Sequence, residues 1–499
     1  MATTYSKNTK KLTKHFSTIQ QFIICLVLTL LLPELLAVSS SGKLVTYLPG
    51  LPFQPLPFHL ETGYIGVGDS ESSTSGDNSD DYQLFYYFFK SEGNPKEDPL
   101  ILWLAGGPRC SALSAVIFEI GPVYMTHGEN ITSGSLPTLT LNPNSWTKLA
   151  NIIFLDQPVH SGFSYSKSSH DSIMSDSESA KNTYEFLIKW LIQNPEFQSN
   201  PLYVAGNSYS GMIVPNVVQD IIRDIEDGTR QFLNFKGYSL GNPVTYPEME
   251  SNSKVEFAHN MGLVSYELYQ SMRVNCNGNF LNFDLSNANC SHDRHVYEDL
   301  ISGINPSHVL EPLCTEGTLT TSHKPKETLK YRQRRRSLKK ISKVLSDEQF
   351  HYSCWRLSEL SEHWANDVAV RKALHVREGT VGKWIRCNWG IGYHVDVKSS
   401  IGYHRNISTK GYRSLIYSGD HDMEVPHIST ESWIRSLVNL SIVDEWRPWF
   451  VNGQIAGYTR AYSNGLTYAS VKGAGHDATG YNPDECYAMF ERWISHKPL

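Results

Sequence analysis

The sequence predicts an α/β fold with a mostly parallel central sheet. Four short apolar runs are typical of strands buried on both faces: LFYYFF (84–89), LILWL (100–104), NIIFL (151–155) and LYVA (202–205). A helical segment separates the last two, and alternation of strands with helices favours parallel pairing. The chain of 499 residues is 40% hydrophobic and 19% charged, which suits a packed globular core.

The helix between those strands is indicated by one apolar stripe at helical spacing. The stripe comprises Ala180, Tyr184, Leu187, Ile188 and Leu191. Asp176 or Ser177 can cap its start, and Pro195 follows its end. Two later runs, RSLIY (413–417) and LTYASV (466–471), predict further strands, and the last helix is expected from Pro483.

The N-terminus is typical of a secretory signal peptide. Four lysines precede the apolar segment 22–38, and small residues follow it. A membrane anchor is the alternative, but Pro33 and Glu34 leave an apolar run shorter than the ~20 residues that a span needs. We therefore expect residues 1–41 to be removed, leaving 42–499 as a single domain in the secretory pathway. The net charge of −6 gives no reason to expect nucleic acid, and no later segment is apolar enough to span a membrane.

The eight cysteines fit an oxidising compartment. Cys25 leaves with the signal peptide, so an odd number remains and one thiol stays unpaired. Cys486 shares an apolar helical face with Met489, Phe490 and Trp493, which predicts a buried free thiol there. The other six cysteines allow three bridges. No spacing suggests a zinc site, so we expect no metal and no cofactor. Four sequons predict glycosylation, at Asn130, Asn289, Asn406 and Asn439.

Residues from about 245 to 390 predict an insertion into the α/β body. They are rich in Asn, His and charge, and they hold most of the cysteines of the mature chain. Within them, 316–349 has few apolar residues and predicts an exposed basic loop. Its RQRRRSLKK run is either a solvated segment, a processing site or an anion patch.

The stretch YVAGNSYSGMIVP (203–215) predicts a nucleophile at Ser208. A strand runs into a Gly, and an apolar run compatible with a helix follows the Ser. A nucleophile elbow is a strained strand-to-helix turn that requires small residues two positions before and after the nucleophile. Gly206 and Ser210 meet that requirement.

An acid and a base follow at the ends of later strands. IYSGDHD (416–422) places Asp420 just past a strand, and VKGAGHD (471–477) places His476 in a glycine-rich turn. Ser208, Asp420 and His476 follow the chain order of α/β-hydrolases. His476 would take the serine proton while the aspartate orients the imidazole. The backbone around Gly106 and Gly107, in WLAGGP (103–108), and the N–H of Tyr209 would then form an oxyanion hole.

These motifs resemble the plant serine carboxypeptidase-like family over nearly the whole mature length. The resemblance rests on LPGLPFQPLPFHLETGYIGV (48–67), WLAGGPRCSA (103–112), LDQPVHSGFSYS (155–166), GNSYSG (206–211), GYSLGNPVT (237–245), YSGDHDMEVP (417–426) and VKGAGH (471–476). It implies an α/β-hydrolase fold with an inserted helical, disulfide-rich region over the active site, in a vacuolar or extracellular protein. It also implies disulfides Cys110–Cys387, Cys276–Cys290 and Cys314–Cys354, with excision of the 316–349 loop in some members.

The family has two chemistries, both through an acyl-serine. Peptidases bind a terminal carboxylate through an Asn and two Glu residues, and the matching positions here are Ala105, Asn207 and Glu119. Only Glu119 is retained, so the carboxyl pair that shares a proton with a peptide is expected to be absent. DHDM (420–423) and EFAHNMGLVSYELY (256–269) resemble the acyltransferase branch. We therefore expect transfer of a phenolic acyl group from a glucose ester to an alcohol.

Two departures from the family pattern leave alternatives open. Arg109 and His160 stand where the family has Gly, and a bulky residue at positive φ is strained by ~1 kcal/mol or more. Either residue could distort the oxyanion loop or fill the pocket, or Arg109 could supply a cation for an acidic substrate. HDATGY (476–481) also replaces the more usual HTAPEY. A weakened companion subunit of an active paralogue and a simple carboxypeptidase are the alternative functions.

Overall fold

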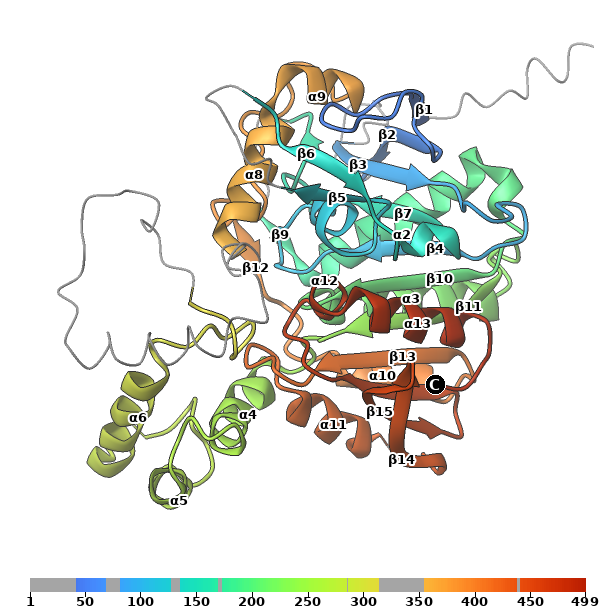
Figure 1. The fold of residues 1–499 in the computed structure, drawn as a ribbon. Coiled ribbons are helices and arrows are strands. Elements are labelled where there is room, and N and C mark those ends of the chain that lie inside the picture. Colours follow the sequence, from blue (N-terminus) through green and yellow to red (C-terminus); the bar gives the residue numbers. More distant parts are fainter. Residues whose placement is uncertain are drawn as a thin grey trace, which may run out of the picture.

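A computed structural model describes residues 42–68, 81–126, 135–168, 173–284, 286–313, 354–437 and 440–499. One large mixed sheet with helices on both faces forms the body, which confirms the α/β-hydrolase fold (Figure 1). The sheet order is β1-β2-β3-β7-β4-β10-β11-β13-β16-β15-β14, with β8 beside β3. The strands from β7 to β16 in this order are parallel, and the outer strands pair antiparallel.

The strand bounds in chain order are β1 Gly42–Val45, β2 Leu60–Val67, β3 Tyr82–Phe89, β4 Leu100–Leu104, β7 Asn151–Leu155, β8 Tyr165–Ser166, β10 Leu202–Asn207, β11 Phe235–Gly241, β13 Arg413–Gly419, β14 Ile442–Val451, β15 Gln454–Tyr462 and β16 Leu466–Val471. Two small sheets pair β5 Val123–Thr126 with β6 Thr138–Leu141, and β9 Met174–Ser175 with β12 Tyr393–His394. The helices are α2 Asp176–Gln193, α3 Ser210–Glu226, α4 Pro247–Asn260, α5 Tyr266–Asn275, α6 Ala288–Ile301, α8 Cys354–Asn366, α9 Val368–Ala373, α10 Ile401–Ser408, α11 His427–Ser436, α12 Ala478–Tyr481 and α13 Pro483–Ile494. Short helical turns lie at Ala115–Glu119, Trp146–Lys148 and Pro195–Phe197.

The central strands are apolar throughout because both of their faces are buried. In β4, Ile101 and Trp103 belong to the apolar cluster beneath α13, while Leu102 and Leu104 belong to the cluster beneath α2 and α3. Successive side chains of a strand point to opposite faces, so a continuous apolar run supplies both cores. Figure 1 shows α13 in front of the sheet and α2 and α3 behind it.

The N-cap expected for α2 was wrong. Ser175 caps the helix by accepting a hydrogen bond from the N–H of Glu178 at 3.2 Å, whereas Asp176 and Ser177 lie within the first turn. Asp176 is unavailable as a cap because its carboxylate accepts hydrogen bonds from other parts of the chain. The antiparallel pair β14–β15 was not predicted, since β14 is largely exposed and carries charged residues and a proline.

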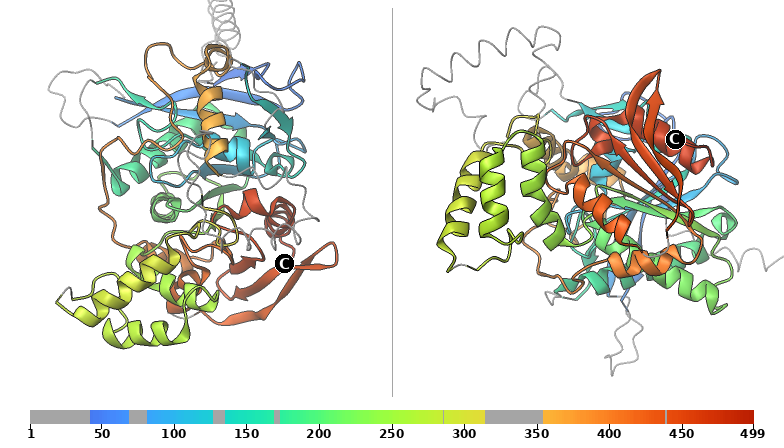
Figure 2. Two further views of the ribbon diagram at one scale, coloured as in Figure 1. Left: turned by 60° about the vertical axis from the view of Figure 1, so that its left-hand side comes forward. Right: turned by 90° about the horizontal axis from the view of Figure 1, so that it is seen from below.

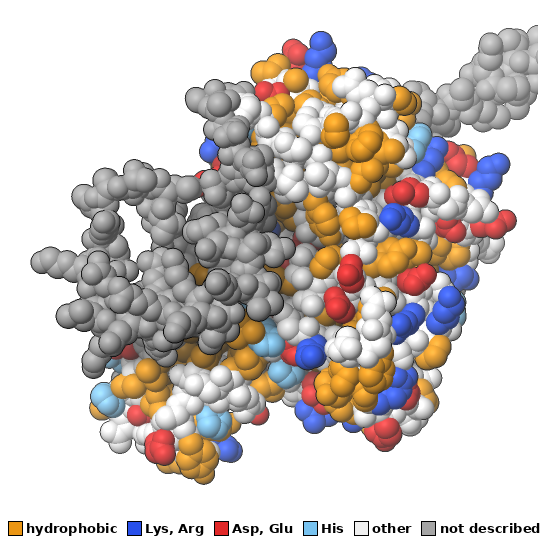
Figure 3. Space-filling view, viewed as in Figure 1, with side chains coloured by type: hydrophobic (Ala, Val, Ile, Leu, Met, Phe, Trp, Pro, Cys, Tyr) orange, Lys and Arg blue, Asp and Glu red, His pale blue; other side chains and the backbone are white. Residues whose placement is uncertain are grey.

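The inserted region forms a separate lobe built from α4, α5 and α6. It has its own small apolar cluster around Phe257 and Met272, next to the disulfide Cys276–Cys290. The lobe projects from one side of the body, next to α11 (Figures 1 and 2). Figure 3 shows histidine and charged side chains on its surface, as its composition indicated. After the inserted region, α8 and α9 lie beside the strands that come from the N-terminal part of the chain (Figure 1).

Several sequence predictions fall outside the described residues. These are the signal peptide 1–41, the basic loop 316–349, the Cys314–Cys354 pair, and the sequons at Asn130 and Asn439. Asn289 and Asn406 are described and are exposed, on α6 and α10. Cys486 is a buried free thiol. Within the described ranges, no helix combines the length and the apolar character that crossing a membrane requires.

Asp156 connects two loops at the carboxyl edge of the sheet. It follows β7 and is fully buried. Its carboxylate accepts hydrogen bonds from the Ser111 hydroxyl at 2.6 Å, the Ala112 N–H at 2.8 Å and the Phe163 N–H at 2.9 Å. These bonds join the loop after β4 to the loop after β7. Burial raises the pKa of Asp156 to about 6, because three hydrogen bonds offset only part of the lost hydration.

The raised pKa of Asp156 predicts that this carboxyl group stabilises the fold at acidic pH. A carboxyl group with a higher pKa in the folded state binds its proton more readily there, so its contribution is present at low pH and is lost as the pH rises through about 6. The shift from 3.8 to about 6 corresponds to roughly 3 kcal/mol. We expect the thermal midpoint of the wild type, relative to that of Asp156→Asn, to fall between about pH 4 and about pH 7. A difference that is independent of pH over this range would show that the pKa of Asp156 is not raised in the folded protein.

Candidate active site

Ser208 lies in a strained turn between β10 and α3. Its φ is 55°, in the left-handed region that residues with a Cβ rarely adopt. The turn is possible because its neighbours are small. A Cβ on Gly206 would lie 2.4 Å from the Leu104 carbonyl oxygen, and one on Gly211 would lie 2.4 Å from the Val244 carbonyl oxygen. The Ser208 N–H donates to the Gly241 carbonyl of the neighbouring strand at 2.9 Å, which fixes the turn to the sheet.

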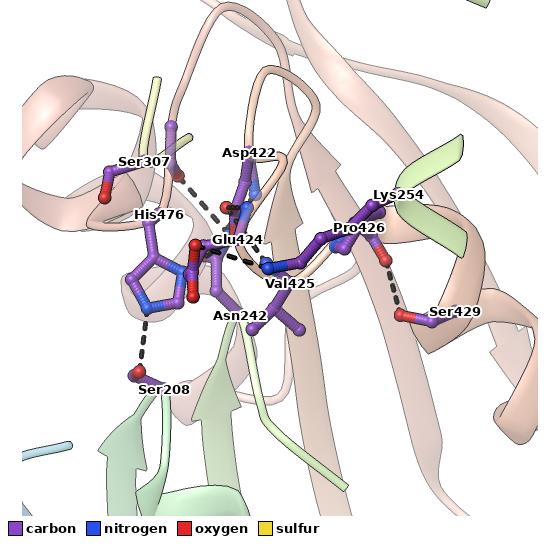
Figure 4. A network of polar contacts seen from close by, with 12 residues as sticks. Ser208, Asn242, Lys254, Ser307, Asp422, Glu424, Val425, Pro426, Ser429 and His476 are labelled. Atoms are coloured by element: carbon purple, nitrogen blue, oxygen red, sulfur yellow. Dashed lines mark hydrogen bonds and ion pairs between the residues drawn. The ribbon is translucent and has the colours of Figure 1, made fainter. Parts of the chain in front are cut away.

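A hydrogen-bonded chain runs from Ser208 through His476 to Asp422 (Figure 4). The Ser208 Oγ lies 2.7 Å from His476 Nε2, and His476 Nδ1 lies 2.8 Å from Asp422 Oδ2. In this geometry Ser208 donates to a neutral imidazole whose Nδ1–H donates to the carboxylate. The arrangement can remove the serine proton as the oxygen attacks a carbonyl carbon.

Asp420 was the wrong choice for the acid. Its Oδ1 contacts the His421 ring nitrogen at 2.6 Å and accepts from the Gly473 N–H at 2.7 Å, away from His476. In the turn after β13, the carboxylate that bonds to the His476 imidazole belongs to Asp422, two residues after Asp420. The string DHD contains two aspartates, and position relative to the strand end favoured the first. Only the path of the turn identifies Asp422.

Asp422 is held in place by donors that converge on a fully buried carboxylate. Oδ1 accepts from the N–H groups of Glu424 at 2.7 Å and Val425 at 3.1 Å. Oδ2 accepts from the Asn242 side chain at 2.8 Å as well as from His476. Asn242 follows β11 with a φ of 44°, so a second left-handed residue supports the site. These donors replace the water that an isolated carboxylate would need.

The same carboxylate changes the acid–base behaviour of His476. Burial of the ring opposes protonation, but the charge and hydrogen bond of Asp422 outweigh it, so the pKa of His476 is raised above its ordinary value of 6.5. Glu424 and Asp477 act in the same direction. A stronger base is more often protonated at acidic pH. Attack by Ser208 therefore requires a pH high enough to leave the ring neutral.

The expected oxyanion donors lie beside the nucleophile. A Cβ on Gly106 would lie 2.6 Å from the Ser208 Cβ, so only glycine permits the loop after β4 to approach so closely. Gly107 follows with a φ of 119°. Within the described ranges, the N–H groups of Gly107 and Tyr209 make no hydrogen bond. Two free donors next to the serine suit an anionic oxygen. Ala105 is buried at the end of β4.

Glu119 is a buried carboxyl group that bonds to Asn207 and lies within the electrostatic influence of a second acid, Asp477. The Asn207 amide donates to Glu119 Oε2 at 3.1 Å. Burial raises the pKa of Glu119 well above its ordinary value, and the charge of Asp477 raises it further. Burial also raises the pKa of Asp477, whose Oδ1 accepts from the Thr479 hydroxyl at 2.9 Å. Asp477 directly follows His476, in HDATGY, where the more usual string HTAPEY has Thr. The replacement of Thr by an acid was the sequence signal for a second carboxyl group at the site.

Arg109 and His160 both adopt the backbone conformation that the glycine positions indicated. Their φ values are 78° and 70°. Arg109 donates to the Ile391 carbonyl at 2.7 Å, and its guanidinium lies 4.9 Å from the centre of the Trp389 ring. The His160 carbonyl accepts from the Asn388 amide at 3.3 Å. Arg109 thus holds segment 387–393 against the oxyanion loop, alongside the disulfide Cys110–Cys387, and His160 connects the same segment to the loop after β7.

The inserted region contacts the loops that carry the acid and the base. The His476 N–H donates to the Ser307 carbonyl at 2.7 Å, and the Met423 N–H donates to the Pro306 carbonyl at 2.9 Å. Lys254 of α4 lies 3.4 Å from Glu424 (Figure 4). The segment after α6 therefore packs on both loops, so the lobe and the site are structurally coupled.

Comparisons with known proteins agree with this geometry. A family model described as serine carboxypeptidase, Peptidase S10, matches residues 49–496. Serine carboxypeptidase-like 8 of Arabidopsis thaliana is 48% identical over 460 residues, which cover 92% of this chain and 96% of that protein. Serine carboxypeptidase-like 17 of the same plant is 46% identical over 471 residues, covering 94% and 97%. The crystal structure of Kex1(Δ)p, a prohormone-processing carboxypeptidase from Saccharomyces cerevisiae, superposes with a TM-score of 0.68 at 18% identity, over 91% of this chain and 95% of that one.

The paired aspartates of the DHD string provide a matched test of the acid. We expect Asp422→Asn to lower hydrolysis of a p-nitrophenyl ester by about 10⁴-fold, because the amide favours the wrong imidazole tautomer. Any residual activity should have its acidic limb at lower pH, since the charge that raises the pKa of His476 is gone. Asp420→Asn should change the rate by less than ~10-fold. An equal loss in the two variants would contradict the assignment of Asp422.

Proposed function

Because this chain belongs to the serine carboxypeptidase family, we propose that it is an acyl-transfer enzyme that moves a phenolic acyl group from a glucose ester to an alcohol through an acyl-serine. The chain of Ser208, His476 and Asp422 supports the enzymatic part of this proposal. The two disulfides in the described part of the chain are typical of the secretory pathway, and a vacuolar or extracellular location belongs to the same proposal.

The first half-reaction loads the serine. His476 takes the Ser208 proton as the oxygen attacks the ester carbonyl, and the carbonyl oxygen becomes an anion facing the N–H groups of Gly107 and Tyr209. The tetrahedral intermediate then breaks its bond to the glucose oxygen. That oxygen takes the proton from His476 and leaves as free glucose, and the acyl group remains on Ser208.

The second half-reaction repeats these steps with an alcohol as the nucleophile. His476 takes the hydroxyl proton while the alcohol oxygen attacks the acyl-serine, and the proton returns to Ser208 as the product ester leaves. Water is the competing nucleophile and gives hydrolysis. The balance between transfer and hydrolysis depends on how well the site holds the alcohol relative to water.

Asn207 is the observation that carries the choice of a neutral donor. It stands beside the nucleophile, and its amide nitrogen contacts Glu119. An amide cannot share a proton as a carboxylic acid does, but its remaining groups can bond to sugar hydroxyls or an ester. A neutral glucose ester satisfies such a site without burying a charge.

A carboxypeptidase is the second candidate, and the presence of a second buried acid, Asp477, whose charge acts on Glu119, favours it. The pKa values of both residues are raised, so both carboxyl groups become protonated at a higher pH than ordinary acids do. Protonated acids could donate hydrogen bonds to the terminal carboxylate of a peptide. The two candidates therefore differ in which neighbour of the catalytic residues contacts the substrate, Asn207 or Asp477.

Substrate comparison separates the two candidates. We expect a phenolic glucose ester to be preferred over a blocked dipeptide with a free carboxylate by at least ~10-fold in kcat/KM, about 1.4 kcal/mol of transition-state binding. The dipeptide amide is the control for the carboxylate. Efficient cleavage of the free acid at acidic pH, reduced in Asp477→Asn and absent for the amide, would establish the peptidase instead.

Removing the nucleophile tests for catalysis itself. Ser208→Ala should abolish both transfer and hydrolysis, because the acyl-serine cannot form. Its thermal midpoint should stay at or above that of the wild type, since alanine loses only a hydroxyl in the turn. Equal background rates with Ser208 present or absent would indicate a companion subunit without catalytic activity, the remaining alternative from the sequence.

A further inference from the structure

Asp176 is a buried carboxylate close to the active site that the mechanism above does not use. It opens α2 and is fully buried. Its Oδ1 accepts from the Tyr209 hydroxyl at 2.9 Å and the Tyr393 hydroxyl at 2.9 Å, and its Oδ2 accepts from the Val397 N–H at 3.1 Å. No ion pair involves Asp176 in the part of the chain that the structure describes. Three donors thus compensate for its burial.

The two tyrosines are donors to this carboxylate. Burial raises the pKa of each phenol, and the charge of Asp176 raises it further, so both hydroxyl groups remain protonated. Their rings meet at a centre-to-centre distance of 6.3 Å and an angle of 81°, an edge-to-face contact. The position of each ring therefore depends on the other and on Asp176.

The contacts of Asp176, Tyr209 and Tyr393 extend to both N–H donors of the oxyanion hole. Tyr209 follows the nucleophile and carries one of the two free N–H groups. On the other side, the Arg109 guanidinium lies 5.7 Å from the centre of the Tyr393 ring and is bonded to Ile391, in the same segment. Arg109 lies two residues beyond Gly107, which carries the other N–H. Tyr393 also pairs with Met174 in the small sheet that leads into α2.

We propose that Asp176 is a positioning residue for acyl transfer, which fixes the N–H of Tyr209 directly and that of Gly107 through Tyr393 and Arg109. The inference rests on the proposed function only in requiring Ser208 to be the nucleophile. Oxyanion donors act at 2.7–3.1 Å, so a small displacement weakens them selectively in the transition state. A purely structural anchor would instead affect stability and leave the reactivity of the folded protein unchanged.

The fold supplies a matched control for a tyrosine–aspartate bond. Tyr184 of α2 donates to Asp224 of α3, which links the same two helices away from the nucleophile turn. Tyr209→Phe and Tyr184→Phe each delete one hydroxyl group that donates to a carboxylate. The Tyr209–Asp176 bond lies beside the Ser208 turn, whereas the Tyr184–Asp224 bond joins α2 to the far end of α3, so only the first bond can position an oxyanion donor.

The test measures how fast Ser208 reacts with a small fluorophosphonate. The phosphoryl oxygen takes the place of the oxyanion, fluoride leaves, and no natural substrate is needed. We expect Tyr209→Phe to react at least ~10-fold more slowly than the wild type, Tyr393→Phe to show a smaller loss, and Tyr184→Phe to react at the wild-type rate. With the p-nitrophenyl ester, the loss should appear in kcat and not in KM. Equal rates for Tyr209→Phe and Tyr184→Phe would overturn the proposal.

Two further measurements separate the remaining outcomes. A wild type that is not labelled at Ser208 would refute the proposed function and, with it, the nucleophile on which this inference depends. Asp176→Asn keeps one oxygen for the two phenols and should retain more activity than Asp176→Ala, measured on folded protein at matched thermal midpoints. If Asp176→Ala does not fold, the tyrosine variants still decide the question.

Discussion

The left-handed backbone at Ser208 is the constraint to which the surrounding residues are fitted. A serine at positive φ is strained, and the strain persists only where neighbouring groups leave the chain no easier path. Gly206 and Gly211 give the turn room against β4 and the loop after β11, and Gly106 allows the oxyanion loop to contact it. The hydroxyl then stands clear of the sheet, within reach of His476. A larger residue at any of these glycines would displace the nucleophile.

Buried carboxylates organise the same edge of the sheet. Asp156 joins two loops, Asp176 joins the nucleophile turn to segment 393–397, and Asp422 orients the imidazole. Each accepts hydrogen bonds from backbone N–H groups and from neutral side chains. Such donors have fixed directions, whereas a cation on a flexible side chain does not. The site therefore gains precise geometry from groups whose positions are set by the fold.

Much of this fold could be predicted because burial on both faces of the central strands leaves a continuous apolar run in the sequence. β4, β7 and β16 lie where that pattern indicated. The exposed strand β14 carries no such pattern, and tertiary contacts alone define it. Ser208 and His476 could be identified from the small residues around them. Asp422 could not be distinguished from Asp420, because the difference is the length of a turn. Asp477 could be noticed in HDATGY as a departure from the usual string, but its influence on Glu119 joins elements that are distant in sequence, so the folded chain was needed to reveal that influence.

His476 follows Ser208 by 268 residues in the chain. The strand that precedes it, β16, inserts between β13 and β15 and is synthesised after the strands that hold the Ser208 turn. Ser208 and its turn can be in place long before, because β10, β4 and β11 precede β16 in the chain. Until β16 pairs with β13, the serine has no base and remains an ordinary hydroxyl group. A Ser208 turn that has folded before β16 pairs therefore does not yet hold an activated nucleophile.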